Sequence, residues 1–199
     1  MFRYPKPMKT ILQLVNIGIL AISSILTADV IALSLAVKEN RSIPDSQLIS
    51  ELDQLAYFEG TWRCEQPANS LSSEPTALNW RVERDLNNSW YVGYAEEVAT
   101  ETNPEPINSQ EFLGYDAVSQ RFVRLAAVGN GNLLNLTSSG WQDEQFVWEG
   151  TVTTRDKLIS LRQIITREGK DLFAAMYFVL NAASNEWQPV INETCERQV

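Results

Sequence analysis

The chain has 199 residues, a formal net charge of −9 and no histidine. So acidic a protein is repelled by nucleic-acid phosphates and by anionic lipid headgroups, so we expect no nucleic acid as a partner. Without histidine, serine–histidine and cysteine–histidine nucleophile pairs are excluded, as is histidine ligation of zinc or haem iron. No segment has the spacing of a calcium-binding loop. We therefore expect no enzyme activity, no metal and no cofactor.

Residues 1–36 have the order of a signal peptide. Basic residues precede a mostly apolar stretch over 11–26, and Ser34-Leu35-Ala36 has the small residues of a cleavage site. The alternative is an uncleaved membrane anchor, because residues 11–37 are long enough to span a bilayer. In both cases we expect the rest of the chain to be exported, to the periplasm or the extracellular space. Membrane contact is expected only if the leader is uncleaved.

The remaining chain predicts a linker, a short helix and then strands. Residues 37–50 are polar and typical of a linker, and leucines recur at helical spacing over 47–58. From residue 60 onward, short runs rich in β-branched and aromatic residues alternate with turn formers. The predicted strands span residues 60–66, 76–85, 89–99, 110–116, 121–128, 132–138, 145–153, 157–166, 171–180 and 186–197. We expect residues 51–199 to form one all-β, antiparallel domain.

The two cysteines, Cys64 and Cys195, lie in the first and the last predicted strand. In an oxidising compartment two cysteines usually form one disulfide. In an up-and-down closed barrel the first strand pairs antiparallel with the last, so the start of one lies opposite the end of the other. A disulfide in a β-sandwich typically joins mid-strand positions across two sheets. The cysteine positions therefore favour the closed barrel.

Several short motifs follow one another along the predicted barrel. They are Phe58-Glu59-Gly60-Thr61-Trp62, Gly114-Tyr115-Asp116 followed by Arg121-Phe122-Val123, Trp148-Glu149-Gly150, and Glu193-Thr194 followed by Arg197. In this order they resemble an uncharacterised bacterial family of lipocalin-like (calycin-type) β-barrel proteins. The resemblance covers residues 52–198 and implies a fold but no established activity. Where that family usually has an aromatic residue between the terminal Glu-Thr and the arginine, this chain has Cys195.

Side-chain alternation links the disulfide to a second contact. Trp62 and Cys64 share one face of their strand, and Cys195 and Arg197 share one face of theirs. If Cys64 lies opposite Cys195 in an antiparallel pair, Trp62 lies opposite Arg197 and a cation–π contact follows. The resemblance implies the same arrangement, because in lipocalins a terminal arginine packs over the Gly-x-Trp tryptophan. We expect Gly60, Trp62 and Arg197 to close the barrel floor.

Candidates for ligand contact are residues whose neighbours suggest an interior face. They are Trp80, Trp90, Tyr94, Arg124, Trp148 and Arg162. The apolar set Leu172, Ala174, Met176 and Phe178 also predicts an interior face. A buried arginine needs a partner, which we expect to be Glu96, Glu149 or an anionic group of a ligand. The alternatives are core packing for the aromatic residues and a solvent-facing position for the arginines.

These features predict an exported protein that binds one small apolar or amphipathic molecule inside its barrel. The alternative is a structural or interaction protein of the cell envelope, whose barrel is filled by its own tryptophans. The interior separates the two, because a ligand site needs a cavity of ~300 Å³ or more.

We expect the exported protein to lack residues 1–36, because a basic start, an apolar core and small residues at 34 and 36 are what signal peptidase recognises. Intact-mass measurement of the protein recovered from outside the cytoplasm tests this. A product that retains Met1 and is released only by detergent would show an anchor instead.

Overall fold

The computed structural model describes residues 50–70, 72–101 and 103–198. The predicted leader over 1–36, and the predicted linker apart from Ser50, lie outside these residues. The described chain begins with one α-helical turn at residues 50–52, which continues into a short 3-10 helix, η1 (Asp53–Phe58). None of the helices in the described ranges is long and apolar enough to cross a membrane.

Strands follow η1 along nearly the whole of the described chain. They are β1 (Gly60–Gln66), β2 (Thr76–Asp85), β3 (Trp90–Glu97), β4 (Asn108–Asp116), β5 (Arg121–Val128), β6 (Leu133–Ser138), β7 (Trp141–Gln142), β8 (Gln145–Thr153), β9 (Leu158–Arg167), β10 (Leu172–Asn181) and β11 (Glu186–Gln198). The strands predicted from the sequence are all present with closely similar bounds. The short β7 was not predicted.

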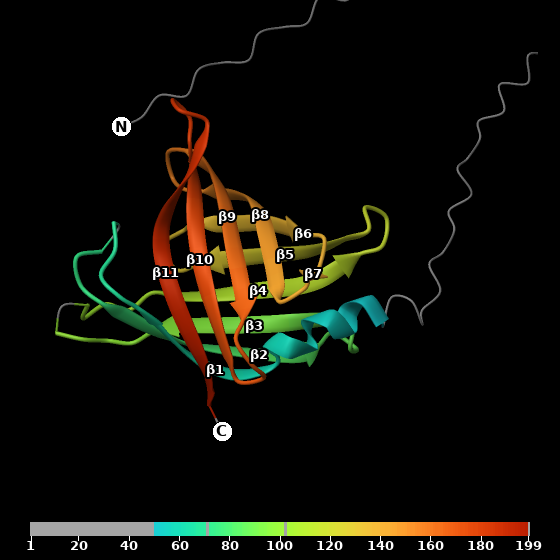
Figure 1. Ribbon diagram of the computed structural model, residues 1–199. Coiled ribbons are helices and arrows are strands. Elements are labelled where there is room, and N and C mark those ends of the chain that lie inside the picture. The colour runs from blue at the N-terminus through green and yellow to red at the C-terminus, as the bar shows by residue number, and fades with distance from the viewer. Residues whose placement is uncertain (1–49, 71, 102, 199) are drawn as a thin grey trace, which may run out of the picture. The chain divides into compact units, whose positions relative to one another are not determined.

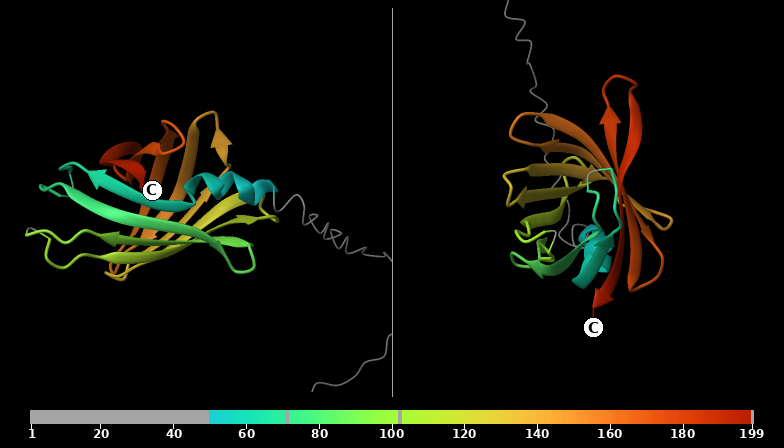
Figure 2. Two further views of the ribbon diagram at one scale, coloured as in Figure 1. Left: turned by 90° about the horizontal axis from the view of Figure 1, so that it is seen from below. Right: turned by 90° about the vertical axis from the view of Figure 1, so that its left-hand side faces the viewer.

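All neighbouring strands are antiparallel, and the sheet closes on itself (Figure 1). β1 to β6 pair in sequence, β6 pairs with β8, β8 to β11 pair in sequence, and β11 pairs with β1. The result is a closed barrel of ten strands, to which β7 is an addition beside β8. Figure 2 shows β2–β4 on one side of the interior and β9–β11 on the other. The predicted all-β, up-and-down closed barrel is confirmed.

One end of the barrel is a solid apolar floor beneath η1. Leu52, Leu55 and Phe58 are buried and recur every third residue, which is the period of a 3-10 helix, so one side of η1 faces inward. The Phe58 ring lies 5.7 Å from the Phe146 ring and 6.2 Å from the Phe173 ring, edge to face in both cases. Aromatic side chains bury ~150–250 Å² each, so this cluster removes a large apolar area from water.

The β1–β11 pairing has the register that the sequence predicted. Cys64 lies opposite Cys195 and the two form a disulfide, and Trp62 lies opposite Arg197. The guanidinium carbon of Arg197 is 4.1 Å from the centre of the Trp62 ring. The predicted cation–π contact is therefore present.

Arg197 also connects the floor to the chain that enters the barrel. Its Nη2 donates to the Tyr57 carbonyl at 2.9 Å, and its Nη1 donates to the Glu59 carbonyl. Gly60 has a φ of +118°, and a Cβ at this position would come within 2.6 Å of Arg197 Nη1. Glycine is required here for both its backbone conformation and its lack of a side chain.

We expect Arg197→Ala to lower the free energy of unfolding by about 1–3 kcal/mol, because it removes hydrogen bonds from a charged donor together with the cation–π contact. Trp62→Ala should cost about 3–5 kcal/mol as a buried aromatic truncation. The double mutant should lose less than the two single losses added, because the residues share one contact. Chemical denaturation of the four proteins measures this, and strict additivity would contradict it.

Candidate functional site

A polar layer lies inside the barrel above the apolar floor. Glu111 and Gln163 are each 2 % exposed. Arg124 donates from Nε to Glu111 Oε2 at 2.5 Å and from Nη1 to Gln163 Oε1 at 2.7 Å. The Trp80 indole N–H donates to the other oxygen of Glu111. Strands β2, β4, β5 and β9 thus contribute to one hydrogen-bonded group.

Small residues on both neighbouring strands make room for Glu111. It lies opposite Gly93 of β3 and opposite Ala126 of β5. A Cβ at Gly93 would come within 2.6 Å of Glu111 Cγ. The carboxylate can therefore lie flat against the barrel wall only because the neighbouring position has no side chain.

The two charges of this layer are paired, but the Arg124 side chain is not fully buried. Burial acts to lower the pKa of Arg124, yet the adjacent Glu111 carboxylate, together with Tyr177 and Glu193, more than offsets this effect, so the pKa is raised and Arg124 stays charged. The Arg124 side chain is 14 % exposed, against 2 % for Glu111. Its Nη2 has no hydrogen-bond partner within residues 50–70, 72–101 and 103–198. One edge of the guanidinium thus has hydrogen-bonding capacity that the described residues do not use.

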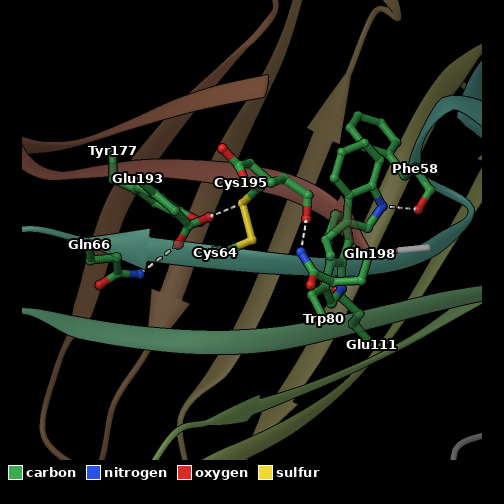
Figure 3. The surroundings of a disulfide bond; sticks show 11 residues. Phe58, Cys64, Gln66, Trp80, Glu111, Tyr177, Glu193, Cys195 and Gln198 are labelled. Carbon is green, nitrogen blue, oxygen red and sulfur yellow. Dashed lines mark hydrogen bonds between the residues drawn. A yellow bond between two sulfur atoms is a disulfide. The ribbon is translucent and has the colours of Figure 1, made fainter. Parts of the chain in front are cut away.

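Glu193 is the centre of a second polar group, beside the disulfide (Figure 3). It is 5 % exposed and accepts a hydrogen bond from Gln66 Nε2 at 2.6 Å and a longer one from the Tyr177 hydroxyl at 3.5 Å. Burial raises the pKa of Glu193, and the Gln66 hydrogen bond and the Arg124 charge offset only part of this rise. Burial also raises the pKa of Tyr177 well above its ordinary value.

The sulfur atoms of Cys64 and Cys195 and the Glu193 carboxylate lie within 4.8 Å of one another, as the ligands of a metal would. Because the sulfurs are bonded to each other, they are not thiolates, and thiolates are what a metal binds. In the oxidised protein these three residues therefore do not provide a metal site.

The two ends of the barrel differ in how deeply their inward-facing side chains are buried. Most of those near η1 are buried, whereas those near the other end are only half-buried. The half-buried set comprises Leu78, Ala95, Leu134, Val152, Tyr177 and Val179. We call this end the mouth. Its walls are mainly apolar, and the polar layer lies between it and the floor.

Three of the candidate residues point into the barrel. Trp80 and Arg124 belong to the polar layer, and Trp148 is fully buried, with its ring 4.8 Å from that of Phe146. The carboxylate partner of Arg124 is Glu111, so the prediction of Glu96 or Glu149 is wrong for this arginine.

Trp90 and Tyr94 lie on the outer face of β3, and the prediction that they face the interior is wrong. Side chains alternate along the strand as expected. The residues that face inward, however, are the odd-numbered ones, beginning with the fully buried Tyr91. The next inward-facing residue of β3 is Gly93, where a larger side chain would collide with Glu111. Trp90 instead packs over the outer side of Gly114.

Arg162 is also on the outer face, again contrary to prediction. It pairs with Glu149, one of its predicted partners, and its guanidinium carbon is 4.4 Å from the Trp187 ring centre. Together with Arg121 it lines an outer cleft of about 390 Å³. The apolar set Leu172, Ala174, Met176 and Phe178 faces outward as well, because Phe173 and Ala175 are the buried residues of β10.

Sequence reasoning missed Glu111, Gln163 and Glu193 as interior groups. A signal existed for Glu193, since it belongs to the terminal Glu-Thr motif and shares the face of Cys195. Glu111 and Gln163 stand in strands whose inner side is known only once the strand pairing is known.

Fold and site together define a closed antiparallel β-barrel with a polar layer in its interior. Neither a protein-family model nor a curated protein matches the sequence. Among solved structures, Rv2717c from M. tuberculosis is similar with a TM-score of 0.54 and 12% identity, covering 74% of this chain and 96% of that one. A redesigned β-barrel matches with a TM-score of 0.40 and 9% identity, covering 73% and 96%. The likeness to Rv2717c supports the barrel fold alone.

We expect Glu111→Leu to lower the free energy of unfolding by about 3–5 kcal/mol, because Arg124 becomes a buried charge without a counter-ion. The double mutant Glu111→Leu/Arg124→Leu should lose less than this single mutant, because both charges are then absent. Denaturant titrations compare them. A double mutant less stable than the single would show that the ion pair is not what the layer depends on.

Glu193→Gln should become more stable relative to wild type as the pH rises. Since burial raises the pKa of Glu193 in the folded state, the folded protein binds the extra proton and gains stability at low pH. That gain is lost as the pH rises from the pKa of the glutamate in the unfolded chain, about 4.3, through its higher pKa in the folded protein. Unfolding curves between pH 4 and 8 test the trend, and a constant difference would contradict it.

Proposed function

We propose that this protein is an exported, non-catalytic barrel that binds one small amphipathic molecule inside. The apolar part of the ligand lies in the mouth, against residues such as Leu78, Ala95 and Val179. Its polar end reaches the interior polar groups around Arg124 and Glu193.

The observation that carries the proposal is the polar layer itself. A buried ion pair stabilises a fold little, because the desolvation penalty offsets the Coulomb attraction. Arg124 nevertheless lies inside the barrel, 14 % exposed, above a solid floor and below half-buried walls. An apolar pocket with a few convergent polar groups is the usual form of a small-molecule site.

Export and the absence of catalysis are supported separately. The basic and apolar order of residues 1–36 supports export, and disulfides are typical of proteins outside the cytoplasm. The chain has no histidine for a nucleophile–base pair. In the polar layer, Glu111 is engaged by Arg124 and Trp80.

A second candidate is an interaction protein that works through its outer surface. One observation favours it: Tyr94, Phe112 and Leu125 are 37–41% exposed on the outer face of β3–β5, and Phe112 lies opposite Leu125. Large exposed apolar side chains that are grouped in this way are typical of protein contacts. This function would require no free space inside the barrel.

We expect the protein to bind prodan, a neutral dye whose emission shifts to the blue in apolar surroundings. Ala95→Trp should weaken this binding by about tenfold or more, because it places an indole in the mouth. Fluorescence titration measures the dissociation constant. Val152→Trp, from the opposite wall, should have the same effect.

The matched control is Ala127→Trp, which adds the same side chain to the exposed outer face of β5. It should leave dye binding at the wild-type level. If Ala127→Trp loses as much dye affinity as Ala95→Trp, or if the wild type binds no dye, the binding function is overturned and the interaction protein is favoured. Circular dichroism of each variant establishes that the barrel is intact.

A further inference from the structure

The two polar groups described above contain three charged side chains, and one of them has no counter-ion. Glu111 is paired with Arg124 at 2.5 Å. Glu193, on β11, has no lysine or arginine nitrogen within 4.0 Å in the described part of the chain, although it is 5 % exposed. With both carboxylates ionised, Glu111, Arg124 and Glu193 together carry one uncompensated negative charge, and an unpaired buried charge is costly.

We propose that the ligand is an amphipathic amine, whose ammonium group binds Glu193 and supplies the missing positive charge. This inference rests on the proposed binding function and names the chemical class of its ligand. It replaces the expectation of an anionic group at Arg124, because that arginine already has Glu111 as a counter-ion.

The free hydrogen-bonding capacity around Glu193 suits an ammonium group. Glu193 Oε2 is engaged by Gln66 at 2.6 Å, whereas Oε1 has only the 3.5 Å contact with the Tyr177 hydroxyl. The nearby Cys195 sulfur, at 3.3 Å, is oxidised and has no proton to donate. A carboxylate accepts about four hydrogen bonds and an ammonium donates three. Oε1 and the tyrosine oxygen, 3.5 Å apart, thus remain as acceptors.

The surroundings favour a cation with an apolar body. Tyr177, which contacts Glu193, is itself one of the half-buried residues of the mouth, and Val179 follows it on the same inner face. An alkyl chain that leaves the ammonium along this face meets apolar walls. The chain's formal charge of −9 attracts cations to the protein before they bind.

Binding of an amine is expected to depend on pH. Groups that act on the titration of Glu193 are Gln66 of β1, Glu111 of β4, Arg124 of β5 and Tyr177 of β10. Because burial raises the pKa of Glu193, an acidic solution neutralises the carboxyl and removes its attraction for the ammonium. Amine affinity should therefore fall as the pH is lowered from 8 to 5, while the affinity of an uncharged alcohol should change little.

The experiment is competition for bound prodan at pH 8 by octylamine, octanol and octanoate, which share one alkyl chain and differ in charge. We expect octylamine to bind about tenfold more tightly than octanol, as a charge-assisted hydrogen bond predicts, and octanoate to bind most weakly. In Glu193→Gln the ratio of octylamine to octanol affinity should fall to within about twofold of one. In Glu96→Gln, which removes an exposed outer-face charge, the ratio should stay at its wild-type value.

An octylamine affinity no greater than that of octanol would overturn the amine proposal, and so would an unchanged ratio in Glu193→Gln. Preference for octanoate would also overturn it and assign the polar end to Arg124. In each of these cases displacement by octanol leaves the binding function standing. If the protein binds neither prodan nor any of the three competitors, the binding function fails, and the amine proposal fails with it.

Discussion

The pairing of β1 with β11 is the constraint on which the rest of the structure depends. Without it the sheet would have two open edges, and no interior would be enclosed. A backbone ladder, a disulfide and the stacking of Arg197 on Trp62 hold the two strands together. The same arginine binds the carbonyl of Tyr57, at the end of η1, so one side chain both closes the ring and fixes the helix over the floor. Closure and floor are therefore one structural unit.

Above that floor, the interior contains charged groups where apolar side chains could pack. A barrel of this size selected for stability alone could be filled with apolar side chains, since buried ion pairs are often replaced by them without loss. Here β3 has Gly93 and β5 has Ala126 beside a buried glutamate, so two strands give up side-chain volume to accommodate one charge. The arginine that compensates this charge keeps a free edge. This arrangement is more easily explained by recognition of a ligand than by folding.

The sequence was sufficient to predict the strands, the closed barrel, the disulfide and the Trp62–Arg197 contact, because these follow from local patterns and from where the cysteines stand. It was not sufficient to tell which face of β3 or β10 points inward. Both faces of these strands are apolar, and the inner one contains small residues, such as Gly93 and Ala175, whose purpose is visible only across the sheet. The alternation was therefore right while its direction was wrong for Trp90 and Tyr94. Glu193 and Gln66 meet through the closure of the barrel, and the predicted register of Cys64 opposite Cys195 already places them opposite each other; what the sequence did not show is that Glu193 is buried.

The disulfide also determines how the protein responds to mechanical force. Cys64 and Cys195 are 131 positions apart, and the bond between them turns nearly the whole barrel into a covalent ring. A pull applied between the two ends of the chain passes through that bond and bypasses the strands between the cysteines. Tension can peel away η1 and the few residues beyond Cys195, but it cannot draw β2 to β10 out into an extended chain. If the leader holds the protein at one end, β2 to β10 would not be extended by loads that straighten everything outside the ring.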